Sequence, residues 1–155
     1  MKFQEEKFLN EIEKLEAFWS LDIRFSSDET VKRHDIYAYP DYDELYDSTI
    51  RVCDILGEIG ILPMTVSDVL RVMAYTNETE DMLDYADECM DLLSLNVLVE
   101  QGYKFSLRDA RWQIAELVGR KKREAWYKYL ILLKEDADPS VAKRAKNALE
   151  AYQVT

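Results

Sequence analysis

Glycine and proline are scarce in this sequence, with four glycines and three prolines among 155 residues. Tight turns depend on these two residue types, so their scarcity disfavours a fold of many short strands. Hydrophobic residues make up 48% of the chain, so the 33% of charged residues do not indicate disorder. The length also suffices to bury a substantial core. These totals predict a folded, mainly α-helical protein that forms one compact unit.

No unbroken apolar stretch of membrane-spanning length is present in the N-terminal segment MKFQEEKFLNEIEKLEAFW, because acidic residues interrupt it throughout. The segment therefore has the pattern of neither a signal peptide nor a membrane anchor. Cys53 and Cys89 both lie among apolar residues at helical spacing, where a reducing compartment would keep them as buried thiols. We therefore expect a cytoplasmic protein that does not bind a membrane.

Motifs of enzyme active sites are missing as well. His34 is the only histidine, and the sequence contains no glycine-rich phosphate loop, nucleophile elbow or metal-ligand spacing. The segment DYDELYD, residues 41–47, gathers four acids but has neither the glycine nor the final glutamate of a calcium loop. Acids are favoured at a helix N-terminus, which explains this cluster without a metal. We predict a protein that is not an enzyme and binds no metal or cofactor.

Positive charge is nearly absent from the middle of the chain. Residues 34–103 contain 16 acids but only Arg51 and Arg71 as bases, whereas residues 104–128 contain eight bases and three acids. The local net charges are therefore −14 and +5, compared with −11 for the whole chain. Such asymmetry affects which partners a protein meets and how fast it meets them, rather than its fold.

Hydrophobic periodicity predicts helices along most of the chain. The expected helices are residues 1–19, a short segment ending at residue 36, residues 41–59, 65–75, 78–93 and 107–119, and two more in the C-terminal region. Gly119 is expected to end one helix, and Asp138 and Pro139 to begin the last one as N-cap and first helical residue. The one β signal is NVLVEQGYKFSL, residues 96–107, whose alternating apolar residues and central glycine predict a hairpin.

The order of three helices and a hairpin resembles the winged helix-turn-helix family over about residues 45–107. The resemblance lies in IRVCDILGEIGILPMTVSDVL for the first two helices and in LLSLNVLVEQGYKFSL for the third helix end and its wing. It implies a winged-helix-like core with one small hairpin over residues 37–107. N-terminal helices (1–36) and C-terminal helices (108–155) would flank this core. In that family the third helix enters the major groove and basic residues contact phosphates.

The C-terminal segment WYKYLILLKEDADPSVAKRAKNALEAY is similar to one HEAT repeat, with an apolar helix, an Asp-x-Asp-Pro turn and a second helix. Looser echoes occur in LYDSTIRVCDILGE and LRDARWQIAELVGR. The period is not constant, since Leu45 and Leu107 are 62 residues apart and Val141 follows 34 residues later. A short HEAT-like α-solenoid is therefore the alternative fold, although it leaves the hairpin unexplained.

The predicted third helix has the wrong charge for reading DNA. Its segment ETEDMLDYADECMDLL, residues 78–93, carries seven acids and no base. On a helical wheel, Met82, Ala86, Cys89 and Leu93 gather opposite an acidic stripe formed by Glu80, Asp84, Asp87 and Asp91. DNA affinity comes largely from Lys and Arg at phosphates, so direct binding of nucleic acid by this helix is disfavoured.

We instead interpret the acids as a surface that docks on a basic protein. The candidate partner-binding residues are Glu80, Asp84, Asp87, Asp91, Asp41, Asp43, Glu44, Tyr42 and Tyr46. A nuclease or another nucleic-acid-binding protein owns such a basic surface, so an immunity protein, antitoxin or phage inhibitor that mimics nucleic acid would fit. Two alternatives stay open: a winged-helix transcription regulator, and a structural adaptor that docks through its HEAT-like end.

A candidate basic patch follows the acidic segment. It consists of Lys104, Arg108, Arg111, Arg120, Lys121, Lys122 and Arg123. Cations near a helix C-terminus complement the helix dipole, so a solvated surface is the simplest interpretation. The patch could also meet nucleic acid, pair with the acids of a second copy in a homodimer, or form an ordered contact within one chain. Charge reversal of the acidic stripe is expected to leave folding nearly intact, since the core lies on the opposite face.

Overall fold

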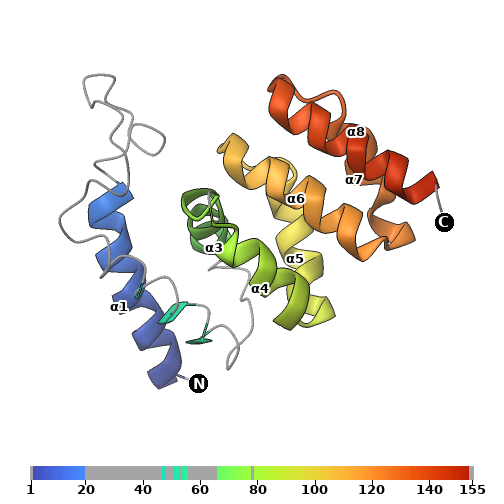
Figure 1. Cartoon of the computed structure of the whole chain (residues 1–155). Helices are drawn as coiled ribbons and strands as arrows, with labels where there is room; N and C mark the ends of the chain where they lie inside the picture. The colour runs from blue at the N-terminus through green and yellow to red at the C-terminus, as the bar shows by residue number, and fades with distance from the viewer. Residues whose placement is uncertain are drawn as a thin grey trace, which may run out of the picture. The chain divides into compact units, whose positions relative to one another are not determined.

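A computed structural model describes residues 2–19, 47, 51–52, 54–55, 66–77 and 79–153. Regular secondary structure in these residues is entirely helical, which confirms the prediction of a mainly α protein (Figure 1). The chain divides into two compact units, Met1–Gly60 and Ile61–Thr155. None of the helices in the described residues is long and apolar enough to cross a membrane.

The first unit contains helix α1 (Lys2–Trp19), where an amphipathic helix was predicted. Phe8 and Ile12 are buried one turn apart, and the described side chains around them are exposed except that of Glu11, which is also buried. Residues 51–52 and 54–55 are also helical, and Val52 and Ile55 add to this core. The rest of the helices predicted before residue 60 lies outside the described residues.

The described residues of the second unit form six α-helices and one short 3-10 helix. These are α3 (Val66–Tyr75), α4 (Asp81–Cys89), α5 (Leu92–Gly102), α6 (Arg108–Lys121), η2 (Glu124–Trp126), α7 (Tyr127–Leu133) and α8 (Pro139–Gln153). Helix α6 lies at the centre and packs against α3, α4, α5, α7 and α8. Its side chains Ile114, Leu117 and Val118 are fully buried, so this helix forms the middle of the core.

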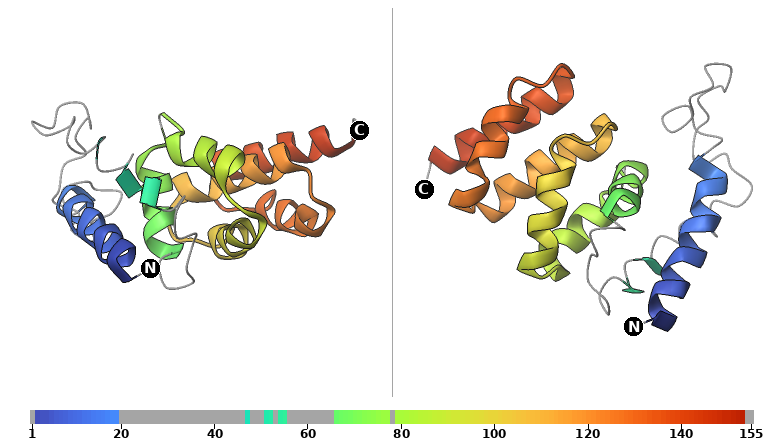
Figure 2. Two further views of the ribbon diagram at one scale, coloured as in Figure 1. Left: turned by 90° about the horizontal axis from the view of Figure 1, so that it is seen from below. Right: turned by 180° about the vertical axis from the view of Figure 1, so that it is seen from behind.

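The helix pairs α5–α6 and α7–α8 follow each other along the chain, and each pair contributes one helix to each of two layers (Figure 2, left). Helices α6 and α8 pack in one layer. In the other layer, Trp126 Nε1, at the start of α7, donates a hydrogen bond to Asn96 Oδ1 of α5 at 2.9 Å. Tyr103 and Tyr129 add a ring contact with centroids 4.8 Å apart. The stacked pairs are compatible with a helical repeat.

The predicted β-hairpin over residues 96–107 is wrong. Its first half continues helix α5, in which Leu95, Leu98 and Val99 are buried at helical spacing. Gly102 is the last residue of this helix and not part of a hairpin turn. A Cβ atom on Gly102 would lie 2.5 Å from Ile114 Cγ1, so the glycine permits close packing of α5 on α6. The described residues therefore provide no wing for a winged-helix fold.

The predicted helix over residues 78–93 is divided in two. Helix α4 ends at Cys89, and Met90 takes an extended conformation before α5 begins. Cys89 and Leu93 are therefore exposed, although both were expected on the buried side with Met82 and Ala86, which are buried. The expectation of a buried Cys89 thiol was wrong because the helix stops before its apolar face is complete.

Gly119 does not end helix α6, which continues to Lys121. A Cβ atom on Gly119 would lie 2.8 Å from Ala148 Cβ, so the glycine lets α6 and α8 approach closely. The C-cap is Lys122, whose backbone is left-handed with φ of 48°. Glycine is the usual residue in this conformation, so sequence reasoning placed the helix end at the nearest glycine.

Candidate partner-binding surface

The predicted acidic stripe lies on α4 and beyond both of its ends. Glu80 precedes the helix, Asp84 and Asp87 lie within it, and Asp91 is the N-cap of α5. The Asp91 carboxylate accepts hydrogen bonds from the Ser94 backbone N–H at 3.0 Å and from Ser94 Oγ at 2.7 Å. These bonds lower the pKa of Asp91. Asp91 therefore has a local structural role in capping, and the stripe proper contains three acids.

Arg120, in the last turn of α6, faces this stripe. Its guanidinium donates hydrogen bonds to Asp84 at 2.9 Å, to Glu80 at 3.1 Å and to Glu116 of its own helix at 3.0 Å. Burial alone would lower the pKa of Arg120, but the hydrogen bonds to Asp84 and Glu116 outweigh burial and raise it. One permanently charged side chain thus links the acids of α4 to α6.

Lys121 adds a second link between the same two helices. Its ammonium group lies 3.0 Å from Asp87 Oδ1 and also donates to the backbone carbonyl oxygen of Asp87. Of the interpretations left open for the basic patch, the ordered contact within one chain is therefore present for Arg120 and Lys121. Sequence reasoning could not select it, because these partners are more than 30 residues apart along the chain.

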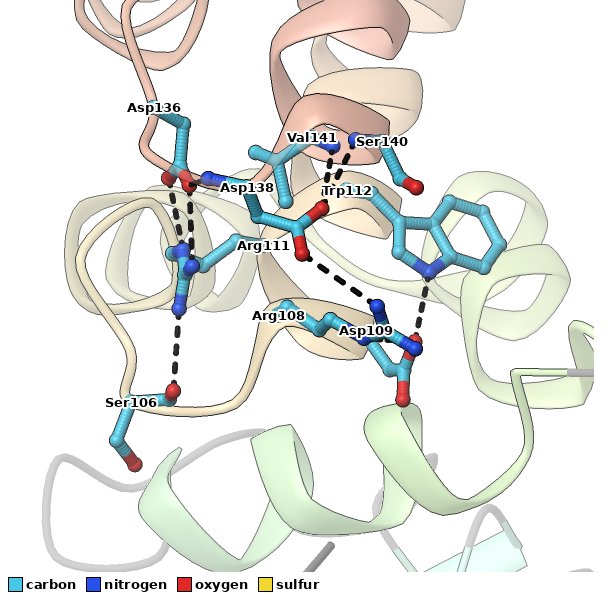
Figure 3. A network of polar contacts seen from close by, with 9 residues as sticks. All are labelled: Ser106, Arg108, Asp109, Arg111, Trp112, Asp136, Asp138, Ser140 and Val141. Carbon is cyan, nitrogen blue, oxygen red and sulfur yellow. Dashed lines mark hydrogen bonds and ion pairs between the residues drawn. The ribbon is translucent and has the colours of Figure 1, made fainter.

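A separate polar network holds the turn between α7 and α8 (Figure 3). Arg111 of α6 binds Asp136 with two hydrogen bonds, from Nε at 2.8 Å and from Nη2 at 3.1 Å. Its Nη1 also donates to the backbone oxygens of Phe105 and Ser106. Burial raises the pKa of Asp136, but its bonds with Arg111 outweigh burial and hold the pKa below its ordinary value. Arg111 is therefore part of the scaffold.

Asp138 begins α8 as its predicted N-cap. Its Oδ1 accepts from the backbone N–H groups of Ser140 at 2.9 Å and of Val141 at 3.2 Å (Figure 3). Its other carboxylate oxygen lies 3.4 Å from Nη1 of Arg108. Arg108 and Arg111 thus both contact the Asp-x-Asp turn, and neither is free to serve as an open basic contact.

Three members of the basic patch remain exposed without an ion pair among the described residues: Lys104, Lys122 and Arg123. Arg123 lies over the ring of Trp126, 5.5 Å from its centroid, and Lys104 lies 5.9 Å from the centroid of Tyr103. Cation–π contacts of this kind leave the positive charge available to solvent or to a partner.

Two exposed acids of α4 and α5, Glu88 and Glu100, form no ion pair within the described part of the chain. Sequence reasoning missed them because it selected acids by their place on one helical wheel. The other predicted partner-binding residues, which are Asp41, Asp43, Glu44, Tyr42 and Tyr46, lie outside the described residues.

Sequence reasoning also missed an apolar groove on α7. The groove has a volume of about 620 Å³ and is lined by Glu124, Ala125, Tyr127, Lys128, Ile131 and Leu132. Leu132 is 55% exposed, while Leu130 and Leu133 of the same helix are buried. A signal was present in the run WYKYLILL, since it contains more apolar residues than one helix face can bury.

The described residues contain no group of three or more His, Cys, Asp or Glu side chains placed to bind a metal ion. No protein-family model, curated protein or solved structure matches this chain. A function can therefore be argued only from the geometry and charge of the chain itself.

Proposed function

We propose that this chain is a protein-binding module whose acidic α4–α5 surface docks on a basic surface of a partner protein. The supporting observation is the charge that remains after the internal ion pairs are formed. Residues 79–102 contain seven acids and no base. Among the described residues, only Arg120 and Lys121 reach these acids from elsewhere in the chain. The surface therefore keeps an excess of five negative charges.

The contact is centred on acids that are not already used within the chain. Glu88 and Glu100 are exposed and form no ion pair among the described residues. Asp84 is 56% exposed and shares one guanidinium with three other carboxylates. A concentrated negative surface steers a basic partner toward itself, so association should be fast and should weaken as salt is added. A nuclease or another nucleic-acid-binding protein is the class of partner that offers such a surface.

The test is a pull-down from native lysate at low and high salt with the tagged full-length chain. The substitutions Glu88→Gln and Glu100→Gln together remove two charges from the proposed contact. The control removes two exposed acids elsewhere, by Glu135→Gln on the turn after α7 and Glu150→Gln on α8. We expect the first pair to abolish salt-sensitive capture of a basic protein and the control pair to retain it.

The captured protein is then purified and titrated with the same variants, so that a direct effect on affinity is measured. A DNA-shift assay on the same preparation separates this function from DNA binding. A sequence-dependent shift, or capture that is equal for the wild type and the variant at Glu88 and Glu100, would show that the acidic surface is not the contact.

A structural adaptor is a second candidate, and the exposed apolar side chains of α7 support it. The pair α7–α8 has the capped Asp-x-Asp-Pro turn for which the HEAT-like resemblance was noted. A repeat of this kind stacks its apolar surface on a neighbour. Capture that survives high salt and is lost on Leu132→Gln would favour the adaptor. No feature of the described residues gives comparable support to a winged-helix regulator.

A further inference from the structure

We propose that a second copy of this chain is one basic partner of the acidic surface. In this contact the turn between α4 and α5 of one copy docks into the apolar groove on α7 of another. The inference rests on the proposed function, because it assigns a partner to the same acidic surface. The turn and the groove both lie in residues 61–155 and complement each other in charge and in apolar character.

The first surface is the acidic turn, defined as Glu88, Asp91, Leu92 and Leu93. Glu88 lies in the last turn of α4, Asp91 is the N-cap of α5, and Leu92 and Leu93 are the first two residues of α5. Leu93 is 78% exposed, and Leu92 is exposed as well. Glu88 and Asp91 are both exposed beside them. The acidic turn therefore combines an apolar tip with negative charge.

The second surface is the α7 groove, defined by its lining residues Glu124, Ala125, Tyr127, Lys128, Ile131 and Leu132. Tyr127, Ile131 and Leu132 provide its apolar part and are all exposed. Lys128 lines the groove, and Lys122 and Arg123 lie directly before its first residue in the chain. None of these three cations forms an ion pair among the described residues, and they outnumber Glu124, the one acid among the lining residues, so this end of α7 carries a net positive charge.

The two surfaces match in both apolar and ionic character. An apolar centre surrounded by opposite charges is the usual arrangement of a specific protein interface. With a net charge of −11, each copy of the chain offers acidic surface to the positively charged end of α7. Because each copy carries one turn and one groove, the contact joins different surfaces on the two copies. This asymmetry makes the contact testable by mixing variants.

The experiment is sedimentation velocity of the purified full-length chain from about 1 to 100 μM, a range that resolves micromolar affinities. The turn variant is Leu93→Gln and the groove variant is Leu132→Gln. The matched control is Leu9→Gln, which changes a leucine of α1 that is also about half exposed. All three positions are exposed, so the substitutions spare the core, and circular dichroism verifies that each variant folds.

We expect the wild type and Leu9→Gln to associate reversibly, and each of the other variants to associate at least about tenfold more weakly, as for loss of a central apolar contact. A mixture of Leu93→Gln and Leu132→Gln should associate again, because the intact turn of one variant fits the intact groove of the other. A wild type that stays monomeric, or a mixture that behaves like its separate components, would overturn the proposal.

The outcome is separable from that of the proposed function. If the wild type is monomeric while capture of a basic protein still depends on Glu88 and Glu100, the self-contact is refuted and the proposed function stands. If capture does not depend on these acids, the proposed function fails whatever the sedimentation result.

Discussion

Gln113 shows how one polar side chain is used inside the core. It is completely buried in α6, and its Nε2 donates to the backbone oxygen of Met73 in α3 at 2.7 Å and to that of Asp109 at 2.6 Å. Its Oε1 has no hydrogen-bond partner among the described residues. The side chain therefore contributes donors to the contact between α3 and α6, and its acceptor is left unused.

Substitutions at Gln113 are expected to distinguish loss of donors from burial of charge. Gln113→Met keeps the volume but removes both bonds, and should lower the free energy of unfolding by about 1–3 kcal/mol. Gln113→Glu at pH 7 should cost more, about 3–5 kcal/mol, because an ionised carboxylate would be buried against two carbonyl oxygens. The same changes at the exposed Gln101 should have effects of only a few tenths of a kcal/mol. Urea unfolding measures the stability of all four variants. Equal losses of unfolding free energy for Gln113→Met and Gln113→Glu would contradict this account.

The pair Arg111–Asp136 is expected to make stability depend on pH. The pKa of Asp136 is lowered in the folded protein from its ordinary value of 3.8, so its stabilising effect is complete above that pH. The effect is lost as the pH falls through the folded pKa, because the protonated acid no longer pairs with Arg111. Arg111→Gln should cost about 1–3 kcal/mol at pH 7 and progressively less below pH 4.

Urea unfolding from pH 7 to pH 2.5 tests the effect of Arg111→Gln, with Lys146→Gln on the exposed face of α8 as the control. If the cost of Arg111→Gln does not change with pH, its stabilising effect comes from the bonds to Phe105 and Ser106 and not from Asp136.

Helix α4 is held against α6 by ion pairs as well as by its buried face. The expectation that charge reversal of the acidic stripe leaves folding intact rested on the helix alone. The structure alters this expectation, because Arg120 and Lys121 would then face lysines at positions 80, 84 and 87. The substitutions best suited to test partner binding are therefore those at Glu88 and Glu100, which leave these links in place.

Reversal of the stripe by Glu80→Lys, Asp84→Lys, Asp87→Lys and Asp91→Lys should destabilise the protein by about 2–4 kcal/mol. Each exposed ion pair accounts for about 0.2–1 kcal/mol of this, and loss of the Asp91 cap for about 1 kcal/mol. Combination with Arg120→Glu and Lys121→Glu should restore part of the loss. The control pair Glu88→Lys and Glu100→Lys should change unfolding by less than about 1 kcal/mol. A reversed stripe as stable as the control would show that the ion pairs contribute little.

Helix α5 illustrates which elements could be predicted from the sequence. Its segment LNVLVEQG satisfies two patterns at once, since valines 97 and 99 alternate while residues 95, 98, 99 and 102 recur at helical spacing. Packing against α3 and α6 decides between the patterns, and that information is not local. Helix α8 was predictable because its signals are local: Asp138 and Pro139 define its start in sequence and in structure alike. The links from Arg120 to α4 join distant residues and could not be read from spacing.

Charge is distributed unequally between the two units of the molecule. Residues 61–155 contain 16 acids and 13 bases, for a net charge of −3, and residues 1–60 therefore carry −8 of the total of −11. The second unit combines an acidic surface on α4–α5 with cations at the start of α7. Its small net charge is therefore the sum of two patches of opposite sign. Long-range attraction of a basic partner thus comes mainly from the net negative charge of the first unit, whereas the proposed local contact lies on the second.

Residues 61–155 are expected to fold without the first unit. Helix α6 is buried by α3, α4, α5, α7 and α8, all of which belong to this unit, and the Arg111 and Arg120 networks are also contained in it. A fragment of this length can bury a sufficient core. It should show a helical circular dichroism spectrum and a single cooperative transition in urea. A gradual transition would mean that the core requires residues 1–60.

If the fragment folds, its capture of a partner should depend less on salt than capture by the full chain does, because the fragment carries only −3 of the net charge.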